Sequence, residues 1–190
     1  MDLLIENIKK YISLSDEDIS LVRILFIRKI FKKGEHLLEA GKICRYIIFI
    51  EEGLVRYYIN NDGTEQTNYF NKENEFVCDY MSFLPKCPSN VNIQALEDTT
   101  VYMISFDGIE RFYREIRQGE RFGRLAIEQV FLSLISQIVS LYTDSPEVRY
   151  RKFLLTYPEI VQRVPQYYIA SYIGVKPPSL SRIRKRIAGT

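Results

Sequence analysis

Histidine and paired cysteines, which carry much of the acid–base and metal chemistry of proteins, are scarce in this chain of 190 residues. The only histidine, His36, follows a turn glycine and is interpreted as a surface residue. Three cysteines, Cys44, Cys78 and Cys87, are widely spaced and form no CxxC pair, whereas zinc and iron–sulfur sites normally have four ligands. We therefore expect free thiols of a cytoplasmic protein, no metal and no cofactor.

Motifs of enzymes and signals for membranes are also missing. The sequence has no glycine-rich phosphate loop, nucleophile elbow or HExxH motif, so we expect that the chain is not an enzyme. No uninterrupted apolar run reaches the roughly 18 residues that span a bilayer. The opening MDLLIENIKK lacks the basic start and apolar stretch of a signal peptide. These absences predict a cytoplasmic protein with no membrane partner.

Acidic residues are absent from the segment Ile160–Thr190. The whole chain carries a net charge of +2, so the preceding 159 residues sum to −4. A basic end on an acidic body is typical of a protein that binds nucleic acid. The six basic side chains of this end are Arg163, Lys176, Arg182, Arg184, Lys185 and Arg186.

Helical and β patterns follow one another in the first part of the chain. Ser15 and Asp18 form a capping box, and Leu14 with Ile19 a hydrophobic staple, at the start of a helix. Residues 26–105 then show short alternating runs with turn signals, among them Gly53 and Asn61-Asp62-Gly63, which predict antiparallel strands joined by tight turns. A short helix is predicted for the segment FDGIERFYREI, which begins at residue 106.

The pattern of residues 118–143 predicts one long helix that is apolar on more than one face. One face can cover the β unit, and the other needs a partner, for which we favour a dimer seam over a core helix of a monomer. Apolar residues recur every seven positions and polar ones interrupt them, so the residues expected at the seam are Leu125, Gln129, Leu132, Ser136 and Val139.

The spacing after Asp144-Ser145-Pro146-Glu147, which restarts a helix, predicts a helix-turn-helix. A first helix begins at Pro165, Gly174 ends it, and a second begins at Pro177. Ala170 provides the small residue where the two helices cross, and Leu180 and Ile183 lock the second helix on the first. The alternative is an ordinary helical hairpin with a solvated basic face.

The opposite face of the second helix could enter a major groove. Arg182 is expected to read a base, with phosphate contact or solvent exposure as its alternative roles, and Gln166, Lys176 and Lys185 to contact phosphates. The full set of predicted DNA-binding residues is Gln166, Tyr167, Lys176, Ser179, Arg182, Lys185 and Arg186.

Nearly the whole chain resembles the catabolite-activator / fumarate-nitrate-reductase regulator (Crp/Fnr) family. KKGEHLLEAGKICRYIIFIEEGLVRYY looks like the opening of its cyclic-nucleotide-binding β-roll, with Gly34-Glu35, Gly41 and Gly53 at the turn positions. The resemblance implies an α+β fold: an antiparallel β-roll sensor in 1–117, a dimerisation helix in 118–143 and a helix-turn-helix domain in 144–190. No wing is evident after the last helix.

The phosphate-binding cassette of the family is altered in this sequence. Glu75 could match the glutamate of the cassette, with Asp79 as an alternative, but Ser89 stands where the arginine should be. A cyclic phosphate would lose its bidentate partner, and nearby Lys86 is a different donor. We therefore expect that neither cyclic AMP nor cyclic GMP is the effector. The effector-pocket residues implied by the resemblance are Glu75, Asp79, Ser89 and Asn90.

The recognition helix also departs from the family. Pro177-Pro178 occupy the positions of the activator's base-reading arginine and glutamate, whereas Arg182 matches a base-contacting arginine. The operator should therefore differ from that of the activator. The cysteine pattern of the oxygen-sensing members is missing, which argues against an iron–sulfur sensor.

The resulting hypothesis is a homodimeric transcription regulator that binds double-stranded DNA. Further partners implied by the resemblance are a small-molecule effector of unknown identity and RNA polymerase. The alternative hypothesis is a ligand-binding regulatory module that acts on a protein partner and carries a vestigial DNA-binding domain.

Overall fold

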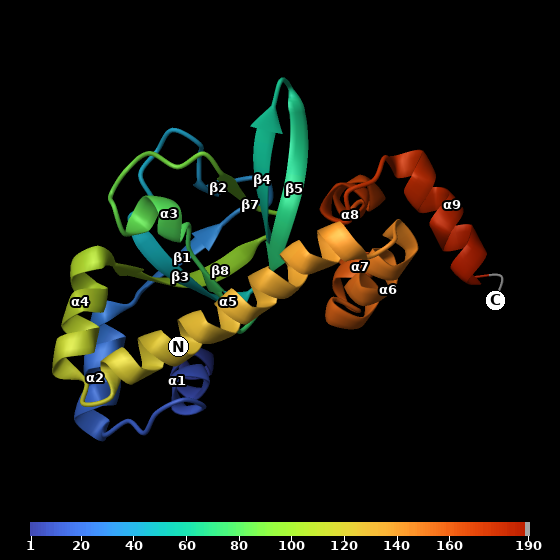
Figure 1. The fold of residues 1–190 in the computed structure, drawn as a ribbon. Coiled ribbons are helices and arrows are strands. Elements are labelled where there is room, and N and C mark those ends of the chain that lie inside the picture. The colour runs from blue at the N-terminus through green and yellow to red at the C-terminus, as the bar shows by residue number, and fades with distance from the viewer. Residues whose placement is uncertain (189–190) are drawn as a thin grey trace. The chain divides into compact units, whose positions relative to one another are not determined.

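The computed structural model describes residues 1–188, in which the chain forms two compact units (Figure 1). The first unit comprises Met1–Ile59 and Phe70–Glu128. The second comprises Asn60–Tyr69 and the chain from Gln129 onward. A segment from the middle of the sequence therefore belongs to the C-terminal unit.

Two helices open the first unit. Helix α2 (Asp16–Leu25) begins with the predicted capping box: the Ser15 side chain accepts a hydrogen bond from Asp18 N, and the Asp18 side chain accepts one from Ser15 N. Helix α1 (Asp2–Lys9) was not predicted, although its apolar residues repeat with helical spacing and are buried. The N-terminal segment is thus part of the folded core.

The β-roll consists of two four-stranded sheets. In the first, the order is β1-β8-β3-β6, with bounds Ile27–Phe31, Thr99–Ser105, Tyr46–Glu52 and Phe76–Val77. In the second, the order is β2-β7-β4-β5, with bounds His36–Leu38, Asn92–Ala95, Val55–Asn61 and Thr64–Asn71. Both sheets contribute buried side chains to one hydrophobic core.

Of the two predicted turns, one connects neighbouring strands of a sheet and the other connects the two sheets. Asp62 and Gly63 both have positive φ and connect β4 to β5 as a hairpin, as the sequence predicts. The turn at Gly53 does not form a hairpin, because β3 and β4 belong to different sheets. Gly53 has φ 112°, and a Cβ there would lie 2.7 Å from Cα of Thr99, so the chain crosses between sheets where only glycine fits.

Short helices complete the first unit. Helix α3 (Tyr80–Phe83) follows β6, and α4 (Phe106–Glu115) follows β8. The long helix α5 runs over Gly119–Thr143, close to the predicted 118–143. Its first turns belong to this unit, where the ring of Phe122 packs on Phe112 and Phe76 at 5.5 and 5.8 Å between centroids.

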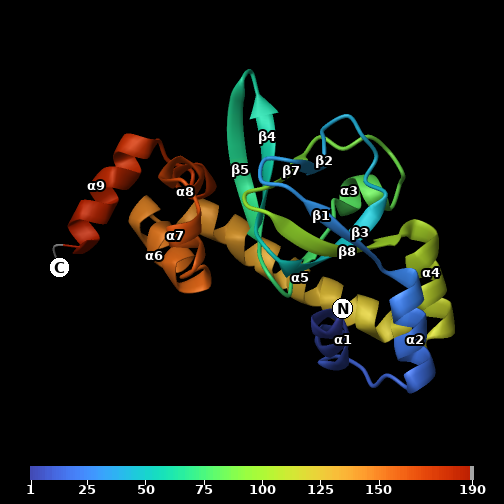
Figure 2. The same cartoon turned by 180° about the vertical axis from the view of Figure 1, so that it is seen from behind.

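The second unit contains the remainder of α5 and four further helices within the described residues (Figure 2). They are α6 (Pro146–Thr156), α7 (Ile160–Arg163), α8 (Gln166–Tyr172) and α9 (Pro177–Ala188). Ser145 caps α6 by accepting from Val148 N, with proline in the first turn, which confirms the predicted helix restart.

Strand β5 of the β4–β5 hairpin is hydrogen-bonded to helices α8 and α5 of this unit. Thr67 N donates to Ser171 Oγ of α8 at 2.8 Å. Gln137 Nε2 of α5 donates to Asn68 O at 2.9 Å. These contacts explain why Asn60–Tyr69 groups with the C-terminal unit.

Candidate nucleic-acid interface and effector cavity

Helices α8 and α9 are joined by a tight turn at Gly174. This glycine has φ 72°, and no atom lies within 3.4 Å of the position of its missing Cβ, so conformation rather than space requires glycine. Gly174 N donates to Ser171 O and Val175 N to Ala170 O, both at 2.9 Å. These bonds satisfy the last carbonyls of α8 and set the direction in which α9 leaves.

Apolar residues hold the two helices together. Ala170 and Ile169 of α8 are fully buried, and Leu180 and Ile183 of α9 are nearly so. The residues whose spacing predicted the helix-turn-helix, from Ala170 to Ile183, are therefore buried where α8 packs on α9. Because this face of α9 is fixed against α8, the opposite face is held outward.

The outward face of α9 is basic. Lys176, just before the helix, and Arg182 and Lys185 within it are all exposed. The guanidinium of Arg182 donates to Ser179 Oγ at 3.3 Å, one turn earlier. Arg186 is also exposed, but it lies 3.8 Å from a carboxylate oxygen of Glu147. Three cations thus form a surface that can meet an anion, with Arg186 beside them in an ion pair.

Two further predicted residues lie at the start of α8. Tyr167 is exposed, and its ring contacts Tyr168 with centroids 4.2 Å apart. Gln166 is partly buried, and its Oε1 is buried with no hydrogen-bond partner among residues 1–188. The amide of Gln166 is therefore less open to a phosphate than the side chains of α9.

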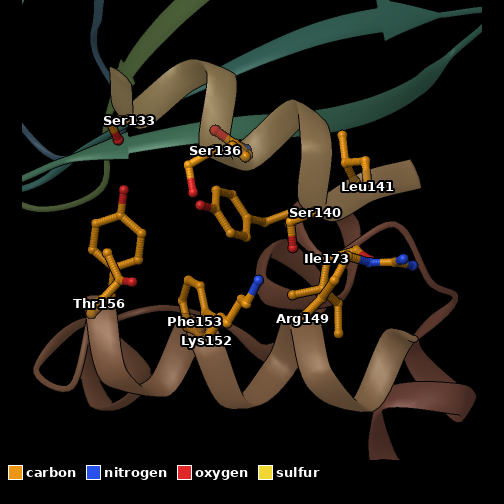
Figure 3. Close-up of a pocket in the computed structure, with 12 residues that line it drawn as sticks. Ser133, Ser136, Ser140, Leu141, Arg149, Lys152, Phe153, Thr156 and Ile173 are labelled. Atoms are coloured by element: carbon orange, nitrogen blue, oxygen red, sulfur yellow. The ribbon is translucent and has the colours of Figure 1, made fainter. Parts of the chain in front are cut away.

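A cavity of about 170 Å³ lies between the C-terminal half of α5 and helices α6 and α8 (Figure 3). Figure 3 shows hydroxyls of Ser133, Ser136 and Ser140 on one wall and Lys152 on the other. Lys152 is 2.6 Å from Asp144, and this contact lowers the pKa of the Asp144 carboxyl. The sequence did not predict this cavity.

Arg149, on the wall of the same cavity, joins three helices of the second unit. Its Nε donates to Ile173 O at the end of α8, at 2.8 Å. Its Nη1 donates to Asp144 O at the end of α5, at 2.7 Å. Arg149 therefore acts as a structural donor to helix ends.

Helix α5 presents an unpaired apolar surface. Within the described chain only Gly119 and Phe122 of this helix are buried. Leu132 is 68% exposed and Val139 is 51% exposed. Of the other predicted seam residues, Gln129 and Ser136 are exposed and Leu125 is partly buried.

By length and composition alone, α5 is also long and apolar enough to cross a membrane, which the count of uninterrupted apolar residues did not indicate. One such helix is weak evidence for a membrane span, since helices with other roles pass the same test.

Two of the predicted cassette residues, Glu75 and Asn90, lie apart from the Asp79–Ser89 pair in their contacts. Glu75 Oε2 accepts hydrogen bonds from Asn71 Nδ2 at 2.8 Å and Lys72 N at 3.1 Å, and so closes a turn. Burial raises the pKa of the Glu75 carboxyl. Asn90 is exposed. Glu75 and Asn90 therefore have no shared target.

Asp79 and Ser89 bind each other. Ser89 is buried, and its Oγ donates to Asp79 Oδ2 at 2.6 Å. The second oxygen, Asp79 Oδ1, accepts from Met81 N and caps α3. A phosphate at this place would face a carboxylate instead of an arginine, which is electrostatically unfavourable.

A cavity of about 350 Å³ opens in the first unit beside the Asp79–Ser89 pair. It is lined by β2, by the segment that leads into β3, and by Val77 and Cys78. Its charged or titratable side chains, whose place in a cavity the sequence did not indicate, are His36, Glu39, Lys42, Cys44, Arg45, Tyr46 and Cys78. None of the predicted cassette residues lines it.

His36 in this cavity is not simply a surface residue. Its Nε2 is 2.9 Å from the hydroxyl of Tyr58, and the ring is partly buried. Among residues 1–188, no cluster of three His, Cys, Asp or Glu side chains could hold a metal ion.

Residues 28–116 match the family model of the cyclic nucleotide-binding domain. Several solved structures share the fold. FixK2 from Bradyrhizobium japonicum has 16% identity and TM-score 0.75, over 86% of this chain and 85% of that one. A regulator described as belonging to the Crp/Fnr family, from Eubacterium rectale, has 19% identity and TM-score 0.71, over 92% and 84%.

The c-di-GMP-responsive global regulator CLP from Xanthomonas campestris matches with 14% identity and TM-score 0.70, over 92% of each chain. No curated protein matches the chain. At these identities the structural matches concern the fold, and they extend beyond the domain found by the family model into the helices that follow it.

Proposed function

We propose that this chain, which contains a cyclic nucleotide-binding domain and has the fold of the Crp/Fnr regulators, is a sequence-specific DNA-binding transcription regulator. The basic outer face of α9 is the observation that most supports DNA binding. Leu180 and Ile183 fix one side of α9 on α8, and Arg182 and Lys185 project from the other. A helix of this kind can enter a major groove.

Arg182 is proposed as the base reader. It lies in the second turn of α9, is exposed, and has Ser179 Oγ as a neighbour that restricts its guanidinium. A guanidinium can donate two parallel hydrogen bonds to O6 and N7 of guanine. Lys176 and Lys185 are point charges suited to phosphates. The remaining proposed DNA-binding residues are Gln166, Tyr167, Ser179 and Arg186.

The proposed assembly is a homodimer through α5. Two recognition helices related by a twofold axis would read half-sites about 34 Å apart, so the operator should be roughly palindromic. The apolar residues exposed along α5 support this arrangement, since a water-soluble helix rarely leaves such a surface uncovered.

The effector is proposed to be something other than cyclic AMP. Asp79 and Ser89 use their polar atoms on each other, and neither lines the charged cavity beside them, where His36, Lys42 and Arg45 lie. A small molecule that binds this second cavity would control the protein without the phosphate cassette.

The test begins by selecting bound genomic fragments with the purified protein, which yields the operator. Arg182→Ala should then weaken the specific complex by about 1–3 kcal/mol and relax preference at one base pair in each half-site. Lys185→Ala is the matched control: it should weaken specific and non-specific DNA alike and reduce the dependence on salt concentration.

Two results would contradict the proposal. If Arg182→Ala lowers affinity for every DNA sequence equally, Arg182 contacts only phosphate. If the unmodified protein shows neither retention on heparin nor salt-dependent binding to DNA, the C-terminal unit does not bind nucleic acid, and a regulatory module acting on a protein partner becomes the better hypothesis.

A further inference from the structure

Two cysteines that are distant in the sequence meet in the first unit. Cys44 Sγ lies 4.0 Å from Cys78 Sγ, although 34 residues separate them. Cys44 precedes β3 and Cys78 follows β6, and these two strands pair antiparallel with Ile48 opposite Val77. The sheet register therefore brings the two thiols together.

The distance is short enough for a bond to form with local movement. A disulfide has a sulfur–sulfur length of about 2.05 Å, so the two sulfurs need to approach by about 2 Å. Neither cysteine lies within a strand: each is in a segment beside one. Such segments can adjust without breaking the ladder between β3 and β6.

A small oxidant can reach the pair. Cys44 is 7% exposed, but both Cys44 and Cys78 line the cavity of about 350 Å³. The third cysteine, Cys87, is exposed at the surface, and its Sγ donates to Met81 O at 3.4 Å. Cys87 is therefore an internal control: it is more exposed than Cys44, and its sulfur contacts a carbonyl oxygen where Cys44 contacts a second thiol.

The two thiols also differ in acidity. The hydrogen bond with Cys78 is the main cause that lowers the pKa of the Cys44 thiol to about 7, against the effect of burial. Burial raises the pKa of the Cys78 thiol. At neutral pH Cys44 thus supplies a thiolate, which is the reactive form, and Cys78 supplies a thiol.

We propose that Cys44 and Cys78 are an oxidisable pair that a hydroperoxide converts to an intramolecular disulfide. The Cys44 thiolate attacks the peroxide, the O–O bond breaks, and Cys44 becomes a sulfenic acid while the leaving oxygen is protonated to water or an alcohol. The Cys78 sulfur then attacks the Cys44 sulfur, the S–O bond breaks, and water leaves with the Cys78 proton. The two thiols supply the two electrons that reduce the peroxide.

The bond would act on the segment that carries α3. Cys78 directly precedes Asp79, which caps α3 and binds Ser89. Cys44 N donates to Ser82 Oγ within α3 at 2.8 Å. Pulling Cys78 toward Cys44 would therefore shift this turn against the wall of the cavity.

None of these steps depends on DNA binding, so mass spectrometry tests them without an operator. The full chain is reduced, freed of reductant, treated with hydrogen peroxide at neutral pH, and then alkylated with N-ethylmaleimide. The expected product has lost the mass of two hydrogens, carries one adduct at Cys87, and yields a linked Cys44–Cys78 peptide on digestion. Dithiothreitol should restore three alkylated cysteines.

Two variants and one condition sharpen the result. Cys87→Ser should still form the linked peptide, and Cys78→Ser should stop at a Cys44 sulfenic acid that dimedone traps. In concentrated urea the rate should fall, since the folded register no longer holds the two sulfurs together. The proposal is overturned if the unmodified protein keeps three alkylatable thiols after peroxide, if Cys87 is the residue that is linked, or if urea leaves the rate unchanged.

Discussion

Leu132→Asp is expected to break the homodimer. Leu132 is 68% exposed on the face of α5 that we assign to the seam, and a twofold axis would bury one copy from each chain. Burial of a whole leucine contributes about 1.5–3 kcal/mol, so this exposed fraction contributes about 1–2 kcal/mol per chain and about 2–4 kcal/mol per dimer. That loss alone raises the dissociation constant by about 30- to 700-fold. A carboxylate buried in the seam adds to this cost.

The assay is light scattering after size-exclusion chromatography, over a dilution series of the unmodified protein and the variant. The unmodified chain should have twice the monomer mass at micromolar concentration, and Leu132→Asp should be monomeric or insoluble. Leu155→Asp is the matched control, because Leu155 is also a leucine, is 83% exposed, and lies on α6 outside the seam. A monomeric unmodified chain, or equal effects of the two substitutions, would refute the reasoning.

Three further predictions concern the first unit. Calorimetry should detect no low-micromolar binding of cyclic AMP, since Ser89, bonded to the Asp79 carboxylate, stands in place of the family's phosphate-binding arginine; removal of a charge-assisted bond costs about 1.5–3 kcal/mol. In a Cys78→Ala, Cys87→Ser variant, the alkylation rate of Cys44 should rise with pH above 5 and level off at high pH, because the thiolate is the form that reacts. Alanine removes the Cys78 hydrogen bond that lowers the pKa of the Cys44 thiol, and the neighbouring Asp79 carboxylate opposes ionisation, so the midpoint should lie above the value of about 7 in the intact pair. Gly53→Ala should lower the midpoint of thermal unfolding more than Gly63→Ala, because both have positive φ but only Gly53 has backbone in the space of the new Cβ.

Local signals made the C-terminal helices predictable from the sequence. The capping residue Ser145, the turn glycine Gly174 and the apolar spacing from Ala170 to Ile183 each act within one or two turns of helix. A short-range pattern of this kind constrains the structure strongly. The α+β class, the long helix and the β-roll were predicted from the same kinds of pattern and from the family resemblance, and they are confirmed.

Structural features that depend on which strands pair could not be predicted from local sequence patterns. The turn at Gly53 looked like a hairpin because the flanking residues alternate, yet β3 and β4 join different sheets. The contact between Cys44 and Cys78 depends on the register of β3 with β6, which no local pattern encodes. For the same reason the sequence did not show that the Glu75 carboxylate accepts hydrogen bonds from Asn71 and Lys72, and its role in an effector pocket stays a prediction.

The outer part of the β4–β5 hairpin, Asn60–Tyr69, matters for the design of chimeras between proteins of this fold. Thr67 reaches Ser171 across 104 residues of sequence, so the C-terminal unit is discontinuous along the chain. During synthesis the hairpin is made before α8, so its contact with Ser171 can form only after the C-terminal helices have been synthesised. Closure of so long a loop is also entropically costly. A chimera that transplants only the chain from Gln129 onward should therefore lose stability, and the hairpin has to be grafted with it.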